Sequence, residues 1–230
     1  MDNKVNEIMK KLDEWVSNHG PIPYSLGNEE SASGNHGKYN LPLVPGIQQV
    51  REEIEEFVSL LVKLNISESA LEIGFGYYGS THFLWRLIFD RVISIEKNHD
   101  RIRTFGSNLN KFYGKWVLND MRSSFLIGLS HETSTVSKVY ELESYGTINL
   151  LFIDGDHNYA NILSEWLLYN HLVKKGGIVA FHDILFDYGD QGGVPIIVSK
   201  LKNGEIGGVK RNIQTIEHSQ TCGIAYYIQE

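Results

Sequence analysis

The sequence predicts an α/β fold with a mostly parallel sheet, and three observations support this prediction. Strand-like apolar runs alternate with stretches of helical periodicity along most of the chain, which is the pattern of βαβ units. A glycine-rich turn separates the first of these strands from a helix. Near the C-terminus, two strand-like runs are joined by only a short polar turn, so the sheet should end in an antiparallel hairpin.

The elements follow one another from residue 47. Apolar residues first recur at helical spacing up to Leu64. Seven short apolar runs then read as strands, and helix-like stretches at residues 81–89 and 162–173 lie between some of them. In chain order, the expected strands cover residues 70–73, 92–95, 116–118, 148–153, 178–181, 212–216 and 223–228.

The N-terminal part of the chain, residues 1–45, is expected to form a helix followed by a lid-like loop. Val5, Ile8 and Leu12 have helical spacing. Residues 20–46 hold all but one of the five prolines and show no periodicity, so they form a long loop. Such a loop is either a lid over a site or a plain connector. Residues 46–230 form the main domain.

Length and composition exclude several classes of protein. The chain has 230 residues, of which 42% are hydrophobic and 21% charged, as in a globular protein with one α/β domain. No apolar run approaches the roughly 20 residues that span a bilayer, and the N-terminus lacks the apolar core of a secretion signal. We therefore expect a cytoplasmic protein with no membrane partner.

The net charge and the cysteine content make further kinds of partner and site less suitable. The net charge of −7 disfavours nucleic acid, because phosphate binding requires clustered Lys and Arg. A small-molecule substrate fits better, and a homo-oligomer is compatible with the sequence. The one cysteine, Cys222, can form no internal disulfide. A cysteine-based metal site would need more ligands than the chain has.

A glycine-rich turn with the spacing G-x-G-x-x-G, formed by Gly74, Gly76 and Gly79, follows the first strand. It indicates either a ligand-binding loop or a simple tight turn. Glu96 ends the second strand about 20 residues later, where a carboxylate can accept the hydroxyls of a ribose. Asp120 follows the expected third strand and suits an adenine amino group.

A polar cluster follows the expected fourth strand, in the stretch IDGDH. Asp154, Asp156 and His157 come directly after the apolar run, at the end of the strand where ligands bind in parallel sheets. The fifth strand ends in His182 and Asp183. These side chains should therefore lie at one edge of the sheet.

Together these motifs resemble class I S-adenosylmethionine-dependent methyltransferases, from about residue 46 to the end of the chain. The pairing of IDGDH with the later HD is similar to small-molecule O-methyltransferases grouped with macrolide-sugar and cephalosporin-tailoring enzymes. The resemblance implies a Rossmann-like fold with a seven-stranded sheet, a C-terminal hairpin and helices on both faces. A nicotinamide-dependent enzyme fits less well, because the hairpin replaces further βαβ units and the sequence has no space for a second, catalytic domain.

The resemblance also assigns cofactor-binding roles. It places the amino-acid end of S-adenosylmethionine at the glycine loop, the ribose at Glu96, and the adenine near the third strand. The residues assigned to the cofactor are Glu72, Gly74, Gly76, Gly79, Ser80, Glu96, Asp120, Met121 and Asp154.

A divalent metal is the next implication of the resemblance. Metal-dependent members bind Mg²⁺ through an Asp after the fourth strand and a pair of residues after the fifth, which correspond to Asp154 and to His182 with Asp183. Two carboxylates suit Mg²⁺, whereas an imidazole ligand favours Mn²⁺, Fe²⁺ or Zn²⁺. The structural alternative is that Asp154 caps the following helix, Asp156 binds loop amides and His182 packs in the core.

His157 is the candidate catalytic residue. It lies three positions after Asp154, where the related catechol enzymes carry a Lys that removes the hydroxyl proton. With an ordinary pKa near 6.5, an imidazole can act as a base at neutral pH. The alternative is a role in starting the helix near Asn158.

The expected function is therefore S-adenosylmethionine-dependent methyl transfer to a hydroxyl of a small molecule, assisted by Mg²⁺ or Mn²⁺. Two alternatives remain open. One is a non-catalytic module that binds S-adenosylmethionine, and the other is a tailoring enzyme with a different reaction on the same fold.

Overall fold

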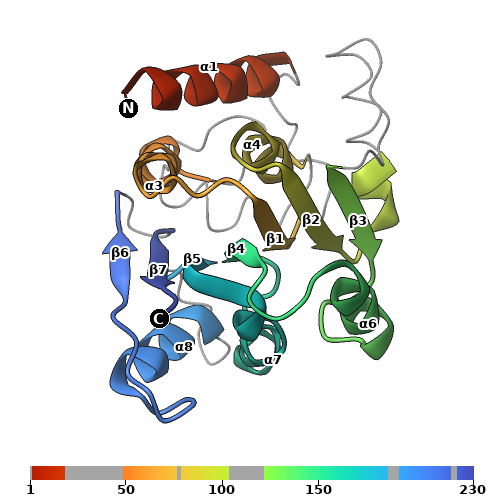
Figure 1. Cartoon of the computed structure of the whole chain (residues 1–230), viewed down its shortest axis with the longest axis vertical. Helices are drawn as coiled ribbons and strands as arrows, with labels where there is room; N and C mark the ends of the chain where they lie inside the picture. The colour runs from red at the N-terminus through yellow and green to blue at the C-terminus, as the bar shows by residue number, and fades with distance from the viewer. Residues whose placement is uncertain (1, 19–48, 77–78, 104–121, 186–191, 219–221) are drawn as a thin grey trace.

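The computed structural model describes residues 2–18, 49–76, 79–103, 122–185, 192–218 and 222–230. Within these residues, seven strands form one sheet in the order β3-β2-β1-β4-β5-β7-β6 (Figure 1). The predicted lid-like loop and the boundary between residues 45 and 46 lie outside them. The strands are β1 Ser69–Ile73, β2 Arg91–Glu96, β3 Ser123–Ile127, β4 Ile148–Ile153, β5 Val173–His182, β6 Gln214–Ile216 and β7 Ile224–Ile228.

The sheet has the predicted mixed topology. Strands β1 to β5 pair in parallel, with β1 between β2 and β4. Strand β7 pairs antiparallel with both β5 and β6, so the predicted C-terminal hairpin is confirmed. The central strands β1 and β4 are buried along their whole length, which explains why most of their residues are apolar.

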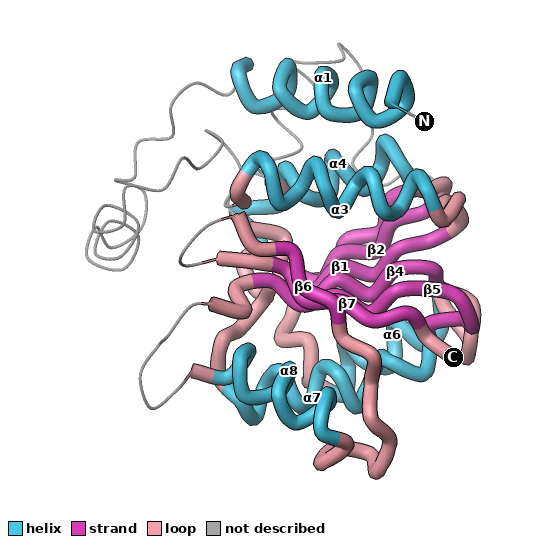
Figure 2. The backbone as a smooth tube through the Cα atoms, turned by 90° about the vertical axis from the view of Figure 1, so that its left-hand side faces the viewer, coloured by secondary structure: helices cyan, strands magenta, loops and turns pink. Residues whose placement is uncertain are grey.

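Helices cover both faces of the sheet, as predicted (Figure 2). Helices α1, α3 and α4 lie on one face, and α6, α7 and α8 lie on the other. Each face has its own cluster of buried apolar side chains. The helices are α1 Asp2–Asn18, α3 Arg51–Lys63, α4 Ser80–Ile88, α6 Thr133–Leu142, α7 Tyr159–Tyr169 and α8 Gly193–Asn203, with a short 3₁₀ helix at Asn170–Leu172. In the described part of the chain, no helix is both long and apolar enough to cross a membrane.

The N-terminal helix α1 belongs to the core and packs against α3 and α4. Its apolar residues Val5, Ile8 and Leu12 are buried as their spacing predicted. Trp15 stacks on Phe83 of α4 with ring centroids 4.4 Å apart. The Trp15 Nε1 also donates a hydrogen bond to the Ser80 Oγ at 3.2 Å. Helix α1 therefore holds the start of α4, where the glycine turn ends.

The position of the third strand differs from the prediction. Strand β3 is Ser123–Ile127 and pairs with β2, whereas we expected residues 116–118, which lie outside the described residues. Strand β3 is half exposed at the edge of the sheet, so it lacks the continuous apolar run of a central strand. Its buried Ser123 receives a hydrogen bond from Arg86 of α4, a polar contact that no apolar pattern reveals.

This shift changes the expected adenine site. Asp120 and Met121 precede β3 rather than follow it, so the reason for placing Asp120 at the carboxyl end of the strand is wrong. Both residues lie outside the described residues. Gly128 directly follows β3, and its N–H donates to the Glu96 carbonyl at 3.1 Å. The segment that begins at Gly128 therefore lies next to the candidate ribose-binding residue.

Candidate functional site

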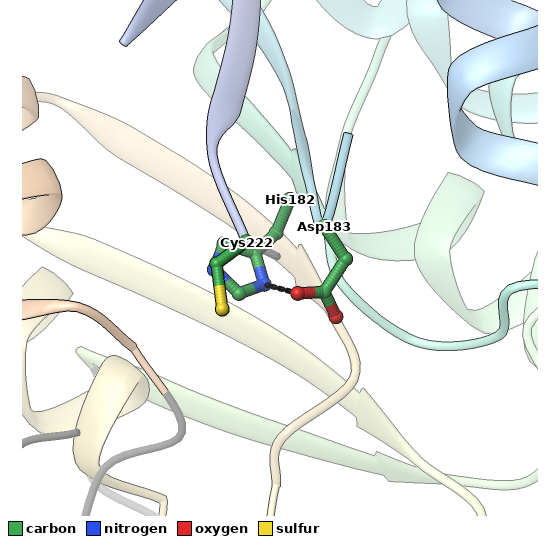
Figure 3. A group of neighbouring side chains, drawn as sticks. All are labelled: His182, Asp183 and Cys222. Atoms are coloured by element: carbon green, nitrogen blue, oxygen red, sulfur yellow. Dashed lines mark ion pairs between the residues drawn. The ribbon is translucent and has the colours of Figure 1, made fainter. Parts of the chain in front are cut away.

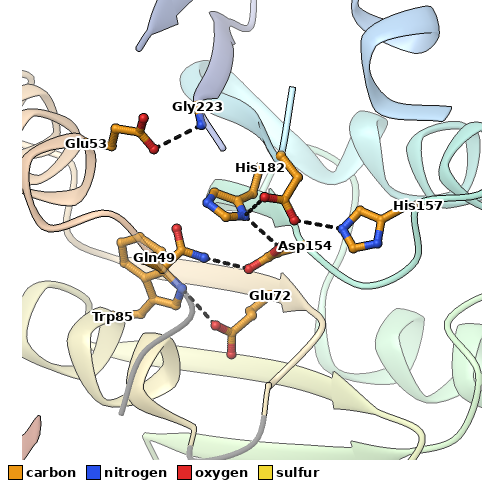
Figure 4. Close-up of polar contacts among 9 residues, drawn as sticks. Gln49, Glu53, Glu72, Trp85, Asp154, His157, His182 and Gly223 are labelled. Atoms are coloured by element: carbon orange, nitrogen blue, oxygen red, sulfur yellow. Dashed lines mark hydrogen bonds and ion pairs between the residues drawn. The ribbon is translucent and has the colours of Figure 1, made fainter. Parts of the chain in front are cut away.

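The carboxyl ends of the parallel strands bring the candidate residues together (Figure 4). Asp154 follows β4, His182 ends β5, and the glycine turn follows β1. Because β1 lies beside β4 and β4 beside β5, these three ends are neighbours. The Asp154 N–H donates to the Ile73 carbonyl at 2.8 Å, which joins the end of β4 to the start of the glycine turn.

The glycine turn needs glycine because other atoms approach it closely. Gly74 has φ 94°, and a Cβ there would lie 2.1 Å from the Asp154 carbonyl oxygen. Gly79 has φ 61° at the N-cap of α4, and a Cβ there would lie 2.1 Å from the Phe75 ring. Gly76 also has a positive φ, 68°, in a region that side chains disfavour. The need for glycine in this turn therefore comes from the close packing against the end of β4, and not only from a ligand.

Glu72 is fully buried beneath this turn. Its Oε1 accepts a hydrogen bond from the Trp85 Nε1 at 3.1 Å, and its Oε2 accepts one from the Ser94 hydroxyl at 2.5 Å. Burial is the main cause that raises the pKa of Glu72 to about 8, although these hydrogen bonds act in the opposite direction. Glu72 thus ties β1 to α4 and β2, and it holds the glycine turn in place.

Glu72 should make the stability of the protein depend on pH. Its pKa rises from 4.5 to about 8 on folding, so the folded protein keeps a proton that the unfolded chain has lost between these values. The free energy of unfolding should therefore fall as pH rises from about 4.5 to about 8. We expect Glu72→Gln to flatten this decline in urea unfolding measured across the range.

A second buried acid provides the control. The pKa of Glu165 is raised to about 7, chiefly by burial, so Glu165→Gln should remove only a contribution that ends near pH 7. The decline between about pH 7 and 8 should disappear only in Glu72→Gln. An unchanged pH slope in Glu72→Gln would show that Glu72 is ionised in the folded protein.

Glu96 ends β2 with its side chain almost wholly buried. One carboxylate oxygen accepts a hydrogen bond from the Asn98 N–H at 2.8 Å, and the other pairs with the Arg101 guanidinium at 3.1 Å. A carboxylate has about four acceptor positions, so these contacts leave capacity for other donors. Glu96 is thus held in a fixed orientation at the end of its strand.

Asp154, His182, Asp183 and His157 form a continuous polar chain (Figure 4). The His182 Nδ1 lies 3.0 Å from the Asp154 Oδ1 and 3.3 Å from the Asp183 Oδ1. The His157 Nε2 lies 2.8 Å from the Asp183 Oδ2. Two carboxylates and two imidazoles therefore alternate along the edge of the sheet.

The charged groups of these four side chains shift one another's pKa values. Burial lowers the pKa of His182, but the charges of Asp183 and Asp154 outweigh this and raise it well above its usual value. Burial raises the pKa of Asp154. Burial also opposes ionisation of Asp183, yet the two imidazoles lower its pKa. The group therefore carries positive charge on imidazole, which a bound cation would replace.

The structure decides separately on each purely structural role that the sequence allowed for these residues: capping a helix, binding loop amides or packing in the core. The Asn158 side chain caps α7 by accepting a hydrogen bond from the Ala160 N–H at 2.9 Å, so neither Asp154 nor His157 provides this side-chain cap. Asp156 does bind loop amides, because it accepts from the Asn158 N–H at 2.8 Å. His182 is buried as a core residue would be, but its Nδ1 faces the two carboxylates.

Two residues of this region were missed from the sequence. Gln49, just before α3, is 1% exposed and donates from Nε2 to the Asp154 Oδ2 at 2.7 Å. Cys222, just before β7, lies near His182 and Asp183. Neither residue belongs to a motif, and their nearest partners in this region are distant in sequence. No sequence signal therefore marks them.

The structure contains two groups that could hold a metal ion among the described residues. Asp154, His157 and Asp183 form the first, and His182, Asp183 and Cys222 form the second. In each group, one ligand atom from every residue lies within 4.8 Å of the others. The two carboxylates predicted for Mg²⁺ thus fit together in the first group. The predicted third ligand, His182, falls in the second group, although it also contacts Asp154.

Comparisons with known proteins agree with this fold. Residues 71–184 match the model of a family described as "Methyltransferase domain". The O-methyltransferase from Bacillus cereus in complex with SAH has the same fold, with a TM-score of 0.59, 20% identity, and coverage of 95% of this chain and 97% of that one. Residues 71–184 are therefore similar to a methyltransferase domain, and the chain has a Rossmann-like class I methyltransferase fold.

Two further similarities have lower coverage. MycE methyltransferase from the mycinamycin biosynthetic pathway, in complex with Mg, SAH and mycinamycin VI, has a TM-score of 0.57 and 17% identity, covering 85% of this chain and 53% of that one. Uncharacterized protein R132 of Acanthamoeba polyphaga mimivirus is 47% identical over 36 residues. This match spans 16% of each chain, so it covers only a small part of that relative.

Proposed function

We propose that the methyltransferase domain matched by residues 71–184 transfers a methyl group from S-adenosylmethionine to a hydroxyl of a small molecule. The observation that carries the proposal is the meeting of the glycine turn with the Asp154, His157, His182 and Asp183 chain at one edge of the sheet. The glycine turn would bind the methyl donor, and the four polar side chains would prepare the acceptor hydroxyl. The B. cereus enzyme with bound SAH and the MycE complex with Mg and SAH support both parts.

The chain's own residues would perform three tasks. Methyl transfer from a sulfonium to oxygen is an in-line displacement, so the acceptor oxygen must be aligned and deprotonated away from water. The glycine turn and Glu96 would bind and orient the cofactor. Asp154 and Asp183 would hold a divalent cation, Mg²⁺ or Mn²⁺, which would lower the pKa of the acceptor hydroxyl when bound. The His157 Nε2 would accept the proton.

We take residues 1–45 as a helix with a lid-like loop and residues 46–230 as the catalytic domain. The helical part of this proposal is supported by α1, which is anchored in the core through Trp15. A cytoplasmic location and a homo-oligomer complete the proposal.

Methyl transfer can be tested directly with labelled cofactor. The full chain, supplied with Mg²⁺ and S-adenosylmethionine carrying a labelled methyl group, should label compounds in a panel of catechols, hydroxylated macrolides and sugars. Mass spectrometry should find the label on oxygen. Binding of the cofactor with no labelled product across the panel would favour a non-catalytic module, and an unmethylated but altered product would indicate another reaction.

We expect Glu96→Ala to weaken binding of S-adenosylmethionine by about 1.5–3 kcal/mol, because a charged acceptor of ribose hydrogen bonds is lost. Calorimetry would measure the affinity. The matched control is Glu141→Ala, since Glu141 is an exposed acid in the last turn of α6. Wild-type affinity in Glu96→Ala would remove Glu96 from the cofactor site.

A further inference from the structure

The second group of potential metal ligands contains three different donor types. His182, Asp183 and Cys222 each offer one ligand atom, and these atoms lie within 4.8 Å of one another (Figure 3). Cys222 is fully buried, and the His182 side chain is 1% exposed. The Asp183 side chain is 13% exposed. An imidazole, a carboxylate and a thiol therefore meet in a largely buried place.

Backbone contacts hold this group together before any cation binds. The Leu185 N–H donates to the Cys222 carbonyl at 2.9 Å, which joins the chain after β5 to the chain before β7. The Gly223 N–H donates to the buried Glu53 carboxylate of α3 at 2.9 Å. Asp183 has φ 60°, a left-handed conformation that is uncommon outside glycine. The fold thus fixes the positions from which the three side chains extend.

His182 supplies an observation that is independent of the cysteine. Its Nδ1 faces the carboxylates of Asp154 and Asp183 (Figure 4). Its Nε2 is buried and has no hydrogen-bond partner among the described residues. Leaving a buried polar atom unpaired costs free energy, and a metal ion is a partner that an imidazole nitrogen commonly takes. Figure 3 shows this ring beside the Cys222 thiol.

We propose that His182, Asp183 and Cys222 form a binding site for a borderline divalent transition metal, of the kind represented by Zn²⁺ and Co²⁺. Thiolate and imidazole suit these ions, whereas Mg²⁺ prefers oxygen ligands. Three protein ligands with a fourth position open is the arrangement of catalytic zinc sites. On binding, the Cys222 thiol and the His182 imidazolium each release a proton to solvent, and the thiolate and the Asp183 carboxylate together balance the charge of the cation.

This second site adjoins the first but is distinct from it in chemistry. The two groups share Asp183, while the first adds Asp154 and His157 and contains no sulfur. A hard cation should therefore prefer the first group, and a borderline cation the second. The proposal concerns metal binding alone and does not depend on methyl transfer.

Cobalt is the probe for this site, because its spectrum reports on sulfur. Titration of the full chain with Co²⁺ should produce a thiolate-to-cobalt charge-transfer band in the near ultraviolet that saturates at one bound ion. X-ray absorption at the cobalt edge should show one sulfur neighbour at about 2.3 Å, as in thiolate sites of Zn²⁺. Zn²⁺ should abolish the band, and excess Mg²⁺ should leave it. Cobalt bound by nitrogen and oxygen alone would overturn the proposal.

Variants give a second measurement. We expect Cys222→Ser to lose the band and to bind Co²⁺ at least ~100-fold more weakly, because loss of even an outer partner costs about 10–100-fold. His157→Gln should keep the band, since His157 belongs only to the first group. Wild-type Co²⁺ affinity in Cys222→Ser would contradict the proposal. If that variant does not fold, the X-ray measurement on the unmodified chain decides.

Discussion

Replacing His157 with alanine is expected to lower turnover by about 10²- to 10⁴-fold, the usual contribution of a general base. The His157 Nε2 lies 2.8 Å from the Asp183 Oδ2 at the edge where the acceptor is proposed to bind. Cofactor affinity should stay near that of the wild type, because the glycine turn and Glu96 belong to other strand ends. Single-turnover rates would measure the effect. His171→Ala is the control, since the His171 ring stacks on Tyr145 outside the site.

The pH profile distinguishes a base from a metal ligand. Burial lowers the pKa of His157, but its hydrogen bond to Asp183 and the charge of that carboxylate raise it overall. The neutral imidazole then predominates only above a pKa higher than the ordinary value near 6.5, so turnover should fall as pH decreases through that region. Bound Mg²⁺ should shift this fall to lower pH, because it weakens the interaction with Asp183.

The variant His157→Ala has three informative outcomes. Loss of the acidic limb with unchanged Mg²⁺ affinity would support the base. A retained limb with weaker Mg²⁺ binding would make His157 a ligand, a role that its grouping with Asp154 and Asp183 allows. Wild-type turnover between about pH 6 and 9, a range around the ordinary pKa, would rule out both roles.

Removing the divalent cation is expected to abolish turnover, and added Mg²⁺ or Mn²⁺ should restore it. Asp154→Asn should have nearly the same effect, with turnover and Mg²⁺ affinity both falling at least ~100-fold, because a charged oxygen ligand is lost. The side chain keeps its shape, so the contacts of Gln49 and His182 at this position can in part remain. Chelator titration and calorimetry with Mg²⁺ would measure the two quantities.

Asp156→Asn provides the matched control for this experiment. Asp156 also follows β4, but its carboxylate accepts hydrogen bonds from the Asn158 N–H and the Asn161 side chain. It belongs to neither group of potential metal ligands, so Mg²⁺ affinity should change little. Full turnover of the unmodified chain in excess chelator would rule out a required cation. Asp154 would then be a residue that orients Gln49 and His182.

The parts of the fold that were predicted correctly have strong local signals. Strand β4 is buried on both faces, so all of its residues except Asn149 are apolar, and its ends match the prediction. The glycine turn can be recognised in the sequence because Gly74 and Gly79 adopt a conformation that other residues disfavour. The C-terminal hairpin was predicted from two strand-like runs and the short turn between them.

The third strand shows where local signals fail. Strand β3 lies at the edge of the sheet and is only partly buried. Its Ser123 is buried because it binds His82 and Arg86 of α4, so a polar residue occupies a core position. The apolar run that we expected to be this strand, at residues 116–118, lies outside the described residues. Asp120 precedes β3, and its assignment to the adenine stays a prediction.

The sequence by itself determined the α/β class, the edge of the sheet that carries the chemistry, and the identity of Asp154, His157, His182 and Asp183 as its polar residues. These follow from local patterns, because a strand and the residues after it are contiguous in the chain. Only the tertiary structure decided how the four side chains pair. It also decided that Gln49 reaches Asp154 and that Cys222 joins His182 and Asp183. Such contacts depend on strand order and helix packing, which bring together residues that lie far apart in the sequence.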